Sequence, residues 1–363
     1  MKVLQIIPSL ASGGAEHFVV DLSNQLKRMG VDVSIGVLGD TGPGSDFCRT
    51  FLDERIPVVS LQVKGYSFFH AICSVYKYVK SATPDVIHCH LSIIQYLVLV
   101  YVLFPKVKVV HTLHSVAKHA SGRSKWHFKL FRSLYRWKVV QPVVISEMCY
   151  RSYVDCYGLR NAIVIENGIV PLRNTSFLDD VRLEVLSYKK NGTTPVFIHV
   201  ARFHEAKNQK MLISVFNRLC VEGVDFCLLI LGRGFDDGEG AILRATACGN
   251  IYFLGEKSNV GDYLKCADFF CLSSLYEGFP ISLIEAMSLG VIPICTPVGG
   301  MVDAVVDGVT GYLSGDVSEA SYYEALLRAL RGHISKEKVV AYFDQNFKMD
   351  RCARRYLGVF EEI

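Results

Sequence analysis

Two kinds of hydrophobic pattern alternate along almost the whole chain. Nearly unbroken apolar runs, such as residues 2–8 and 195–201, are typical of strands buried on both faces. Between such runs the apolar residues recur at spacings of three and four. Phe18, Leu22 and Leu26, for example, share one face of a helix that we expect to end at Gly30. The alternation predicts an α/β protein whose parallel sheets are covered by helices.

This rhythm runs through the chain twice. Strands are expected in a first series at 2–8, 31–38, 85–90, 108–114 and 142–146, and in a second at 193–202, 224–232, 250–255, 268–274 and 291–296. Between the two series, Gly, Pro and Asn interrupt the pattern over 167–176. We therefore expect two Rossmann-like β/α/β domains in series, facing each other across a cleft. Ligands of such sheets bind at the carboxyl ends of the strands.

Composition and charge fit a globular protein with two different halves. Half of the residues are hydrophobic and a fifth are charged. Residues 1–170 hold 19 Lys and Arg against 11 Asp and Glu, a balance of +8, whereas the remainder holds 20 against 24, a balance of −4. Opposite charge suggests that the halves have different partners. The twelve cysteines form no Cys-x-x-Cys pair, which favours reduced thiols in the cytosol.

No segment of the sequence predicts a membrane span. The longest apolar run, 96–104, is shorter than the roughly 20 residues that a spanning helix needs, so we expect a buried helix there. The first 16 residues have some features of a signal peptide. Their apolar stretch is short and interrupted by Gln5 and Pro8, which favours a first β-strand.

The first candidate for ligand binding is "SGGAEH", residues 12–17, between the first strand and the first helix. Gly13 and Gly14 let a ligand approach the backbone closely, and amides at a helix N-terminus favour an anion. A phosphate contact and a simple tight turn both fit this stretch.

The second candidate is "VARFHEAKNQK", residues 200–210. Arg202 follows a strand, and Lys207 lies five residues later, near a helix start. Two cations at the strand ends of a parallel sheet suit a diphosphate, because each charge pair is worth about 4 kcal/mol at 4 Å and an effective dielectric of about 20. Ordinary surface charge on a solvated loop is the alternative.

The third candidate is "SSLYEGFPISLIEAM", residues 273–287. Glu277 is expected in a loop at a strand end, Pro280 at the first position of a helix, and Glu285 close to the helix's inward face. A buried carboxylate needs a donor, which is either a ligand hydroxyl or a core partner such as an arginine. The amides of residues 279–282 point towards any anion in front of the helix.

The fourth candidate is a group of histidines, His88, His90, His111 and His114, at expected strand ends of the first domain. Imidazoles are good zinc ligands, but only Cys89 lies near enough in sequence to complete a site, and its side chain should point to the opposite face. We therefore favour a histidine that hydrogen-bonds a ligand in the cleft, with His114 best placed.

Taken in order, these motifs resemble those of the family-4 retaining glycosyltransferases, which have the GT-B fold and include enzymes of bacterial cell-surface polysaccharide and lipid-linked oligosaccharide synthesis. Arg202-x4-Lys207 and Glu277-x7-Glu285 carry the resemblance. It extends over nearly the whole chain through "GGAE" at 13–16 and "HTLHS", "VISE", "ENGIV" and "VGG" further on.

The resemblance implies a role for each matching residue. The donor would be a UDP-linked nucleotide-diphosphate sugar, with Arg202 and Lys207 neutralising its diphosphate. Glu277 would contact the donor sugar, and His114 would hydrogen-bond that sugar near the acceptor. The implied catalytic residues are Glu277, His114, Arg202 and Lys207, and the implied donor-binding residues are Gly14, Arg202, Lys207, Glu256, Phe279, Pro280, Ile281 and Glu285.

The resemblance also implies further features of the enzyme. No metal or other cofactor is expected, and the acceptor would be a lipid-linked glycan or a polysaccharide. The expected domains are 1–168 for the acceptor and 169–346 for the nucleotide sugar, with a last helix, 347–363, returning to the first domain. Ser115 and Arg233 depart from the residues common in the family, which affects the acceptor side and contacts to the base.

A basic helix is expected at 123–138, within a stretch from 86 to 146 that has no Asp or Glu. Trp126, Leu130, Leu134 and Trp137 would form one stripe, with cations on the adjoining one. Such a helix suits an anionic membrane surface, although a domain helix with solvated charges also fits. We expect a cytoplasmic protein, peripheral on the inner face of the cell membrane. No nucleic-acid partner is expected, because no binding module accompanies the charge.

Other functions are compatible with parts of this pattern. A sugar-nucleotide epimerase or glycosyl phosphorylase of the same fold would have similar motifs. An NAD-dependent oxidoreductase is disfavoured by the missing Gly-x-Gly-x-x-Gly. A catalytically silent sugar-binding protein is disfavoured because Arg202, Lys207 and Glu277 are all present.

Overall fold

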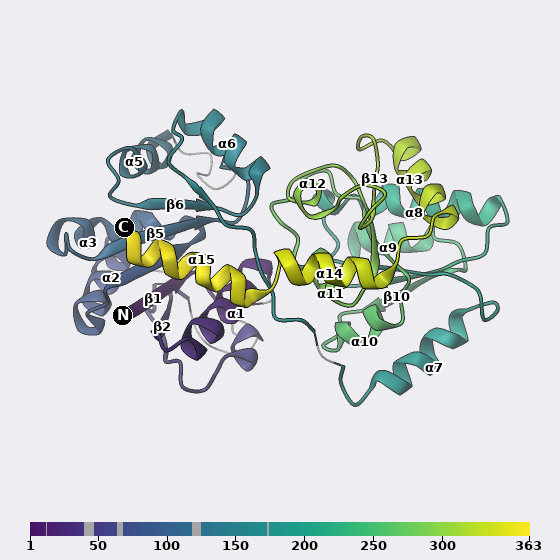
Figure 1. Cartoon of the computed structure of the whole chain (residues 1–363), viewed down its shortest axis with the longest axis horizontal. Helices are drawn as coiled ribbons and strands as arrows, with labels where there is room; N and C mark the ends of the chain where they lie inside the picture. Colours follow the sequence, from purple (N-terminus) through teal and green to yellow (C-terminus); the bar gives the residue numbers. More distant parts are fainter. Residues whose placement is uncertain (12, 40–46, 64–67, 118–124, 173) are drawn as a thin grey trace. The chain divides into compact units, whose positions relative to one another are not determined.

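The computed structural model describes residues 1–11, 13–39, 47–63, 68–117, 125–172 and 174–363. The chain divides into two compact units, shown in Figure 1. Unit 1 comprises Met1–Val170 together with Phe347–Ile363, and unit 2 comprises Pro171–Asn346. The sequence prediction set the first boundary at residue 168 and the return at residue 347. In these described residues no helix is long and apolar enough to cross a membrane.

Unit 1 is built on a parallel sheet of seven strands in the order β3-β2-β1-β4-β5-β6-β7. The order reverses between β1 and β4, which places a topological switch point there. The strands are β1 (Lys2–Ile7), β2 (Asp32–Val37), β3 (Val58–Ser60), β4 (Val86–His90), β5 (Lys108–Leu113), β6 (Gln141–Val144) and β7 (Ile163–Val164).

Helices cover this sheet because each has one apolar face. In α1, Phe18, Leu22 and Leu26 are buried at the helical spacing that the sequence showed. The remaining helices of unit 1 are η1 (Phe47–Phe51), α2 (Phe68–Ala82), η2 (Leu91–Leu97), α3 (Val98–Leu103), α5 (Lys125–Arg136), α6 (Glu147–Tyr157) and α15 (Met349–Glu362), and α1 itself is Gly14–Arg28.

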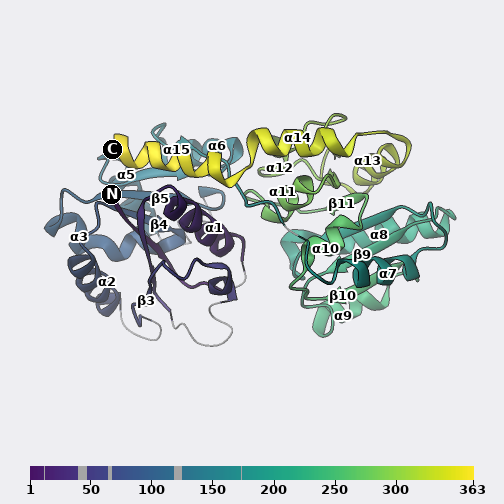
Figure 2. The same ribbon diagram turned by 60° about the horizontal axis from the view of Figure 1, so that its bottom comes forward.

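The last helix, α15, belongs to the core of unit 1, where it packs beside α1 (Figure 2). Tyr356 is fully buried and its hydroxyl lies 3.0 Å from Thr112 Oγ1 on β5. Lys108 Nζ donates to the carbonyls of Phe360 and Glu361, both at 3.1 Å, and so satisfies the carbonyl end of the helix.

Unit 2 contains a second parallel sheet, of six strands in the order β10-β9-β8-β11-β12-β13. Its order reverses between β8 and β11. The strands are β8 (Val196–Val200), β9 (Cys227–Leu231), β10 (Ile251–Gly255), β11 (Phe269–Leu272), β12 (Ile292–Cys295) and β13 (Tyr312–Leu313).

The helices of unit 2 follow its strands as βαβ connections require. They are α7 (Leu178–Tyr188), η3 (Glu205–Lys207), α8 (Gln209–Val221), α9 (Gly238–Ala245), α10 (Val260–Lys265), α11 (Ile281–Ser288), α12 (Met301–Ala304), α13 (Glu319–Arg331) and α14 (Lys336–Asn346). The prediction of two Rossmann-like α/β domains is therefore confirmed. The cleft between them stays a prediction.

The helix expected after Glu277 differs in detail from its prediction. Pro280 immediately precedes α11, with extended backbone at ψ 117°, instead of occupying the first helical position. The buried face consists of Leu283, Ile284, Ala286 and Met287, whereas Ile281 and Leu289 are only half-buried. Glu285 is likewise half-buried, so it was wrong to expect it near the inward face of the helix.

The prediction of a buried apolar helix at 96–104 was also partly wrong. The segment 96–104 is helical, but Val102 and Leu103 are 70% and 53% exposed. In α5 the buried residues are Phe131, Leu134 and Tyr135, because they face the sheet. Of the stripe expected from Trp126 to Trp137, the two tryptophans are exposed and Leu134 is buried.

We expect Tyr356→Ala to destabilise the protein by about 3–5 kcal/mol, because it removes a fully buried ring from the core shared by α1, α15 and β5. Tyr356→Phe is the matched control. It keeps the ring and loses only the bond to Thr112, at a cost of about 1 kcal/mol. Urea unfolding measures both values, and equal losses for the two variants would contradict the proposed packing role.

Candidate active site

The sequence-predicted residues of unit 2 follow the two strands at its switch point. Arg202 and Lys207 come after β8, and Glu277 comes after β11, the strand paired with β8. Because both strands are parallel, the two loops emerge at the same edge of the sheet. This is the edge at which open α/β sheets bind ligands.

Lys207 and Glu277 form an ion pair between Nζ and Oε1. Their side chains are only 23% and 12% exposed, so the pair is shielded more than a surface pair. Ser274 Oγ also donates to the same carboxylate oxygen, at 2.9 Å. The structure therefore joins one of the two predicted cations directly to one of the two predicted carboxylates.

The loop that carries the cations is held by Gln209, which is buried at the start of α8. Gln209 Nε2 donates to the Arg202 carbonyl at 2.9 Å and lies 3.3 Å from His199 Nε2. His199 Nδ1 donates to the Cys271 carbonyl at 2.8 Å, so its Nε2 is left to accept from Gln209. Burial lowers the pKa of His199 to about 4, which keeps the ring neutral.

The two strand-end loops are also bonded to each other. Ser273 Oγ donates to the carbonyls of Lys207 and Asn208, at 2.9 and 3.1 Å. The Leu275 amide donates to the Ala206 carbonyl at 2.8 Å. These neutral bonds fix the backbone of both charged residues independently of the ion pair.

Two glycines allow the "VGG" loop after β12 to pack against the Glu277 loop. The Gly300 amide donates to the Gly278 carbonyl at 2.5 Å. Gly299 has φ +58°, and a Cβ at this position would overlap the Glu277 carbonyl. A side chain at residue 299 is therefore excluded both by the backbone conformation and by the close approach.

The other predicted donor-binding residues of unit 2 lie on strand-end loops or in α11. Arg202 is exposed, and among the described residues its guanidinium has no ion-pair partner. The remainder are Phe279 and Pro280, both buried before α11, Ile281 and Glu285, both half-buried in α11, and Glu256, exposed after β10.

In unit 1 the predicted residues follow strands at that unit's own switch point. Gly14 is exposed at the first position of α1, after β1. His114 follows β5 and is half-buried. Its Nε2 lies 2.9 Å from Nδ1 of His90, at the end of β4.

The four predicted histidines do not form one group. His88, His90 and His114 occupy one face of the sheet, whereas His111 lies on the other, between Tyr135 OH at 2.7 Å and the Leu91 carbonyl at 2.5 Å. Alternation of side chains along β4 and β5 is the cause. No group of three or more His, Cys, Asp or Glu able to hold a metal is found within the described ranges.

The residues of these networks that the sequence prediction missed include Ser274, Gln209 and Gln5. Gln5 is fully buried on β1, where its Oε1 lies 2.8 Å from His90 Nε2. A lone glutamine in the apolar run "VLQII" was an available signal. Ser274 and Gln209 gave no such signal, because polar residues are ordinary in loops and at helix starts.

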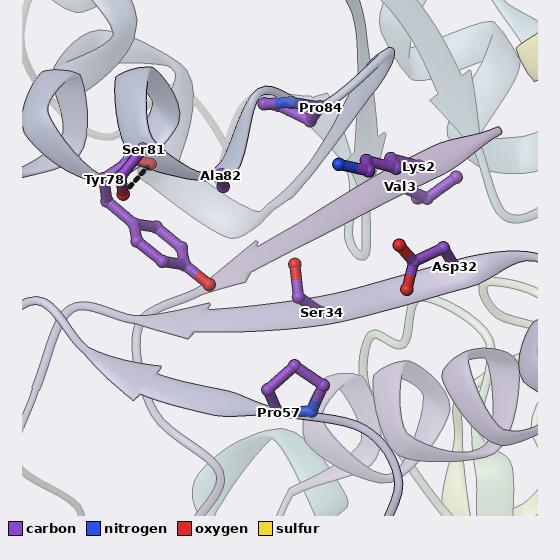
Figure 3. A pocket seen from close by; sticks show the side chains of 9 residues that line it. All are labelled: Lys2, Val3, Asp32, Ser34, Pro57, Tyr78, Ser81, Ala82 and Pro84. Atoms are coloured by element: carbon purple, nitrogen blue, oxygen red, sulfur yellow. Dashed lines mark hydrogen bonds between the residues drawn. The ribbon is translucent and has the colours of Figure 1, made fainter.

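A hollow of about 270 Å³ in unit 1 lies away from these residues (Figure 3). Lys2, Asp32 and Ser34 line it at the beginnings of β1 and β2, and Tyr78 closes one side. It is thus at the amino-terminal edge of the sheet, opposite the edge that carries Gly14 and His114. Nothing links it to the candidate site.

Two family models match the chain. The model described as "Glycosyltransferase Family 4" matches residues 12–172, and the one described as "Glycosyl transferases group 1" matches residues 184–345. The matched segments correspond closely to the first 170 residues of unit 1 and to unit 2.

Similar proteins include two curated enzymes. The Escherichia coli UDP-Gal:alpha-D-GlcNAc-diphosphoundecaprenol alpha-1,3-galactosyltransferase is 23% identical, over 94% of this chain and 89% of its own length. The Staphylococcus aureus capsular polysaccharide biosynthesis glycosyltransferase CapH is 26% identical, over 79% and 78%. Among solved structures, Anabaena HepE in complex with UDP-glucose has a TM-score of 0.79 at 19% identity, with both chains fully covered.

Gly299→Ala should disturb the Lys207–Glu277 pair, because the added Cβ overlaps the Glu277 backbone. Gly308→Ala is the matched control, since Gly308 also has positive φ (+72°) but open space around it. We expect the control to lose about 1–2 kcal/mol of stability from backbone strain alone, and Gly299→Ala to lose more. Urea unfolding of both variants is the measurement, and a smaller loss at residue 299 would contradict the close packing.

Proposed function

The chain belongs to glycosyltransferase family 4, and from this premise we propose that it is a retaining enzyme of cell-surface glycan synthesis. It transfers a hexosyl or N-acetylhexosaminyl group from a nucleotide-diphosphate sugar, UDP-linked, to a lipid-linked glycan or polysaccharide acceptor. The observation that carries the proposal is the Lys207–Glu277 pair at the switch point of unit 2. The HepE complex and the E. coli relative support UDP as the nucleotide, since their names state UDP-glucose and UDP-Gal.

The cations suit the leaving group of this reaction. When the bond between sugar and diphosphate breaks, negative charge grows on the departing phosphate. Arg202 and Lys207 are presented on one short loop whose backbone is fixed by Gln209 and Ser273. Preorganised charges of this kind stabilise the transition state without reorganising during the reaction.

Glu277 has a different part in the proposal. In the ligand-free chain its carboxylate balances Lys207 and accepts from Ser274. A bound diphosphate supplies a second anion for Lys207, which frees acceptor positions on Glu277 for the sugar hydroxyls. Glu285 accepts from the ribose hydroxyls, the amides around Phe279 to Ile281 face the phosphates, and the loop at Glu256 contacts the base.

We propose front-face transfer as the route to retention. The departing phosphate oxygen accepts the proton of the acceptor hydroxyl as that hydroxyl attacks the same face of the sugar. Double displacement would need a carboxylate nucleophile, as in retaining hydrolases. The only carboxylate proposed to touch the sugar, Glu277, accepts from the sugar hydroxyls in this proposal and from Ser274, and is given no contact with the reacting carbon. A glycosylated enzyme found by intact mass spectrometry would contradict this step.

We also propose that the reaction needs no metal ion or other cofactor. Two fixed cations supply the charge that a divalent metal would otherwise bring to the diphosphate. Activity that persists in excess chelator is the expected outcome.

A surface of unit 1 suits contact with a membrane that carries a lipid-linked acceptor. We propose that the protein is cytoplasmic and binds the inner face of the cell membrane. Trp126 and Trp137, at the two ends of α5, are 52% and 75% exposed. Lys129, Arg136 and Lys138 are exposed between and beside them. Arg123 and Ser124, the first residues of the expected basic helix, lie outside the described residues. Aromatic rings with flanking cations favour the headgroup region of anionic lipids.

Donor binding depends on the two cations in this proposal. We expect Lys207→Ala and Arg202→Ala each to weaken binding of UDP-sugar about 10- to 100-fold, which corresponds to the loss of a charge-assisted hydrogen bond. Glu277→Gln should mainly lower kcat. Lys210→Ala, which removes an exposed cation in the first turn of α8, is the matched control and should leave binding unchanged.

Isothermal titration with a panel of UDP-sugars measures these affinities, and the sugar that most raises the melting temperature identifies the donor. The proposal fails if no nucleotide sugar binds the wild type, or if Lys210→Ala weakens binding as much as Lys207→Ala.

Membrane binding should depend on the exposed face of α5. We expect the wild type to sediment with vesicles containing anionic lipid at low salt, and the Lys129→Glu/Arg136→Glu double variant to remain largely in solution. Lys190→Glu/Lys210→Glu changes the net charge equally in unit 2 and should still bind. Equal binding by both double variants would show that this face is not the membrane contact.

A further inference from the structure

Gln5, His90 and His114 form a hydrogen-bonded chain across three neighbouring strands of unit 1. Gln5 lies on β1, His90 ends β4, and His114 follows β5. Gln5 Oε1 is 2.8 Å from His90 Nε2, and His90 Nδ1 is 2.9 Å from His114 Nε2. Gln5 and His90 are fully buried, and only His114 reaches the surface.

The donor and the acceptor of each hydrogen bond in this network can be assigned. An amide oxygen only accepts, so the proton of His90 resides on Nε2. Burial lowers the pKa of His90 well below its usual value, which keeps a single proton on the ring. His90 Nδ1 is then an acceptor, and the proton between the two rings must belong to His114 Nε2.

We infer that Gln5 and His90 are positioning residues that fix His114 as its Nε2–H tautomer, leaving His114 Nδ1 as an acceptor for a ligand hydroxyl. Among the described residues, Nδ1 of His114 has no hydrogen-bond partner. This inference rests on the proposed function, in which the ligand hydroxyl belongs to the sugar being transferred or to the acceptor.

The surroundings of the chain support a functional interpretation. Gln5 Nε2 is buried and has no partner within the described part of the chain, so the glutamine contributes only its oxygen to the network. Such an amide costs more to bury than an apolar residue would. Proteins keep buried polar groups without hydrogen-bond partners chiefly at functional sites.

Packing fixes the orientation of the rings as well. The Phe18 ring of α1 meets His114 edge-on, with centroids 5.5 Å apart, and also contacts Tyr356 at 5.8 Å. The His88 ring lies 4.1 Å from that of His90. His114 is thus held against rotation by an aromatic ring as well as by His90.

The arrangement favours hydrogen-bond acceptance over proton abstraction. Burial lowers the pKa of His114 to about 3, so its imidazole is a weak base at neutral pH. A neutral ring with a fixed lone pair instead orients a hydroxyl. This agrees with the proposed reaction, in which the departing phosphate takes the proton.

The test is the tautomeric state of His114 in protein labelled with ¹⁵N-histidine. Two-bond ¹H–¹⁵N correlations distinguish the two tautomers, and His114→Ala identifies the signal. In the wild type we expect a single Nε2–H form. Observation of the Nδ1–H form in the wild type would overturn the inference, whatever the variants do.

Gln5→Met removes the acceptor while keeping the side-chain length. We expect it to mix the tautomers of His114 and to lower kcat about 10-fold or more, the range for a partner that supports a functional histidine, with KM for the donor nearly unchanged. Thr112→Val is the control. It removes a buried hydroxyl that hydrogen-bonds His88 and Tyr356 in the same core and is not a link of the Gln5–His90–His114 network, and it should keep both the tautomer and kcat.

An unchanged tautomer in folded Gln5→Met would contradict the inference. If the wild type shows the Nε2–H form but transfers no sugar from any donor, the proposed function fails while the assignment of the tautomer stands.

Discussion

The candidate site depends on one constraint, the charge balance between Lys207 and Glu277 at the switch point of unit 2. Both side chains are mostly shielded, and a half-buried cation without an anion is costly. In the ligand-free chain, the Glu277 carboxylate supplies the anion that Lys207 requires. In the proposed function a diphosphate supplies this anion from outside, so binding would exchange one anion of Lys207 for another instead of leaving a charge to be desolvated anew.

Such an exchange requires that the backbone of the two loops stays in place when the side chains of Lys207 and Glu277 change partners. Ser273, Gln209 and the Leu275 amide bind backbone carbonyls of the loops that carry the pair, and none of these bonds involves a charged side chain. The glycine at residue 299 brings a third loop against Glu277. The neutral bonds therefore keep the loops in place in both states of the ion pair, which is what preorganisation for a developing charge requires.

Sequence reasoning located the loops correctly and failed on side-chain environments. Strand patterns placed Arg202, Lys207 and Glu277 at one sheet edge, because strand direction follows from the βαβ rhythm alone. The short edge strands β3, β7 and β13 escaped notice, since two or three residues give no periodicity. The exposure of Trp126 and Trp137 did not follow from the sequence alone, because period 3.6 identifies faces of a helix without saying which one meets the sheet. Gln5 was overlooked because its partner, His90, is distant in sequence and adjacent only in the sheet.

The two units contribute different chemistry, and glycosyl transfer needs both kinds. Unit 2 presents full charges at its switch point, where the proposed function puts the leaving diphosphate. At its own switch point unit 1 presents neutral imidazoles, whose pKa values burial lowers below the usual range. Neutral groups suit a partner that must be oriented without gaining or losing charge, such as a hydroxyl. The same sheet topology thus carries two sites with different electrostatics. In unit 1 the site consists of hydrogen-bonded neutral histidines. In unit 2 it is a salt bridge whose backbone is held by hydrogen bonds from uncharged groups.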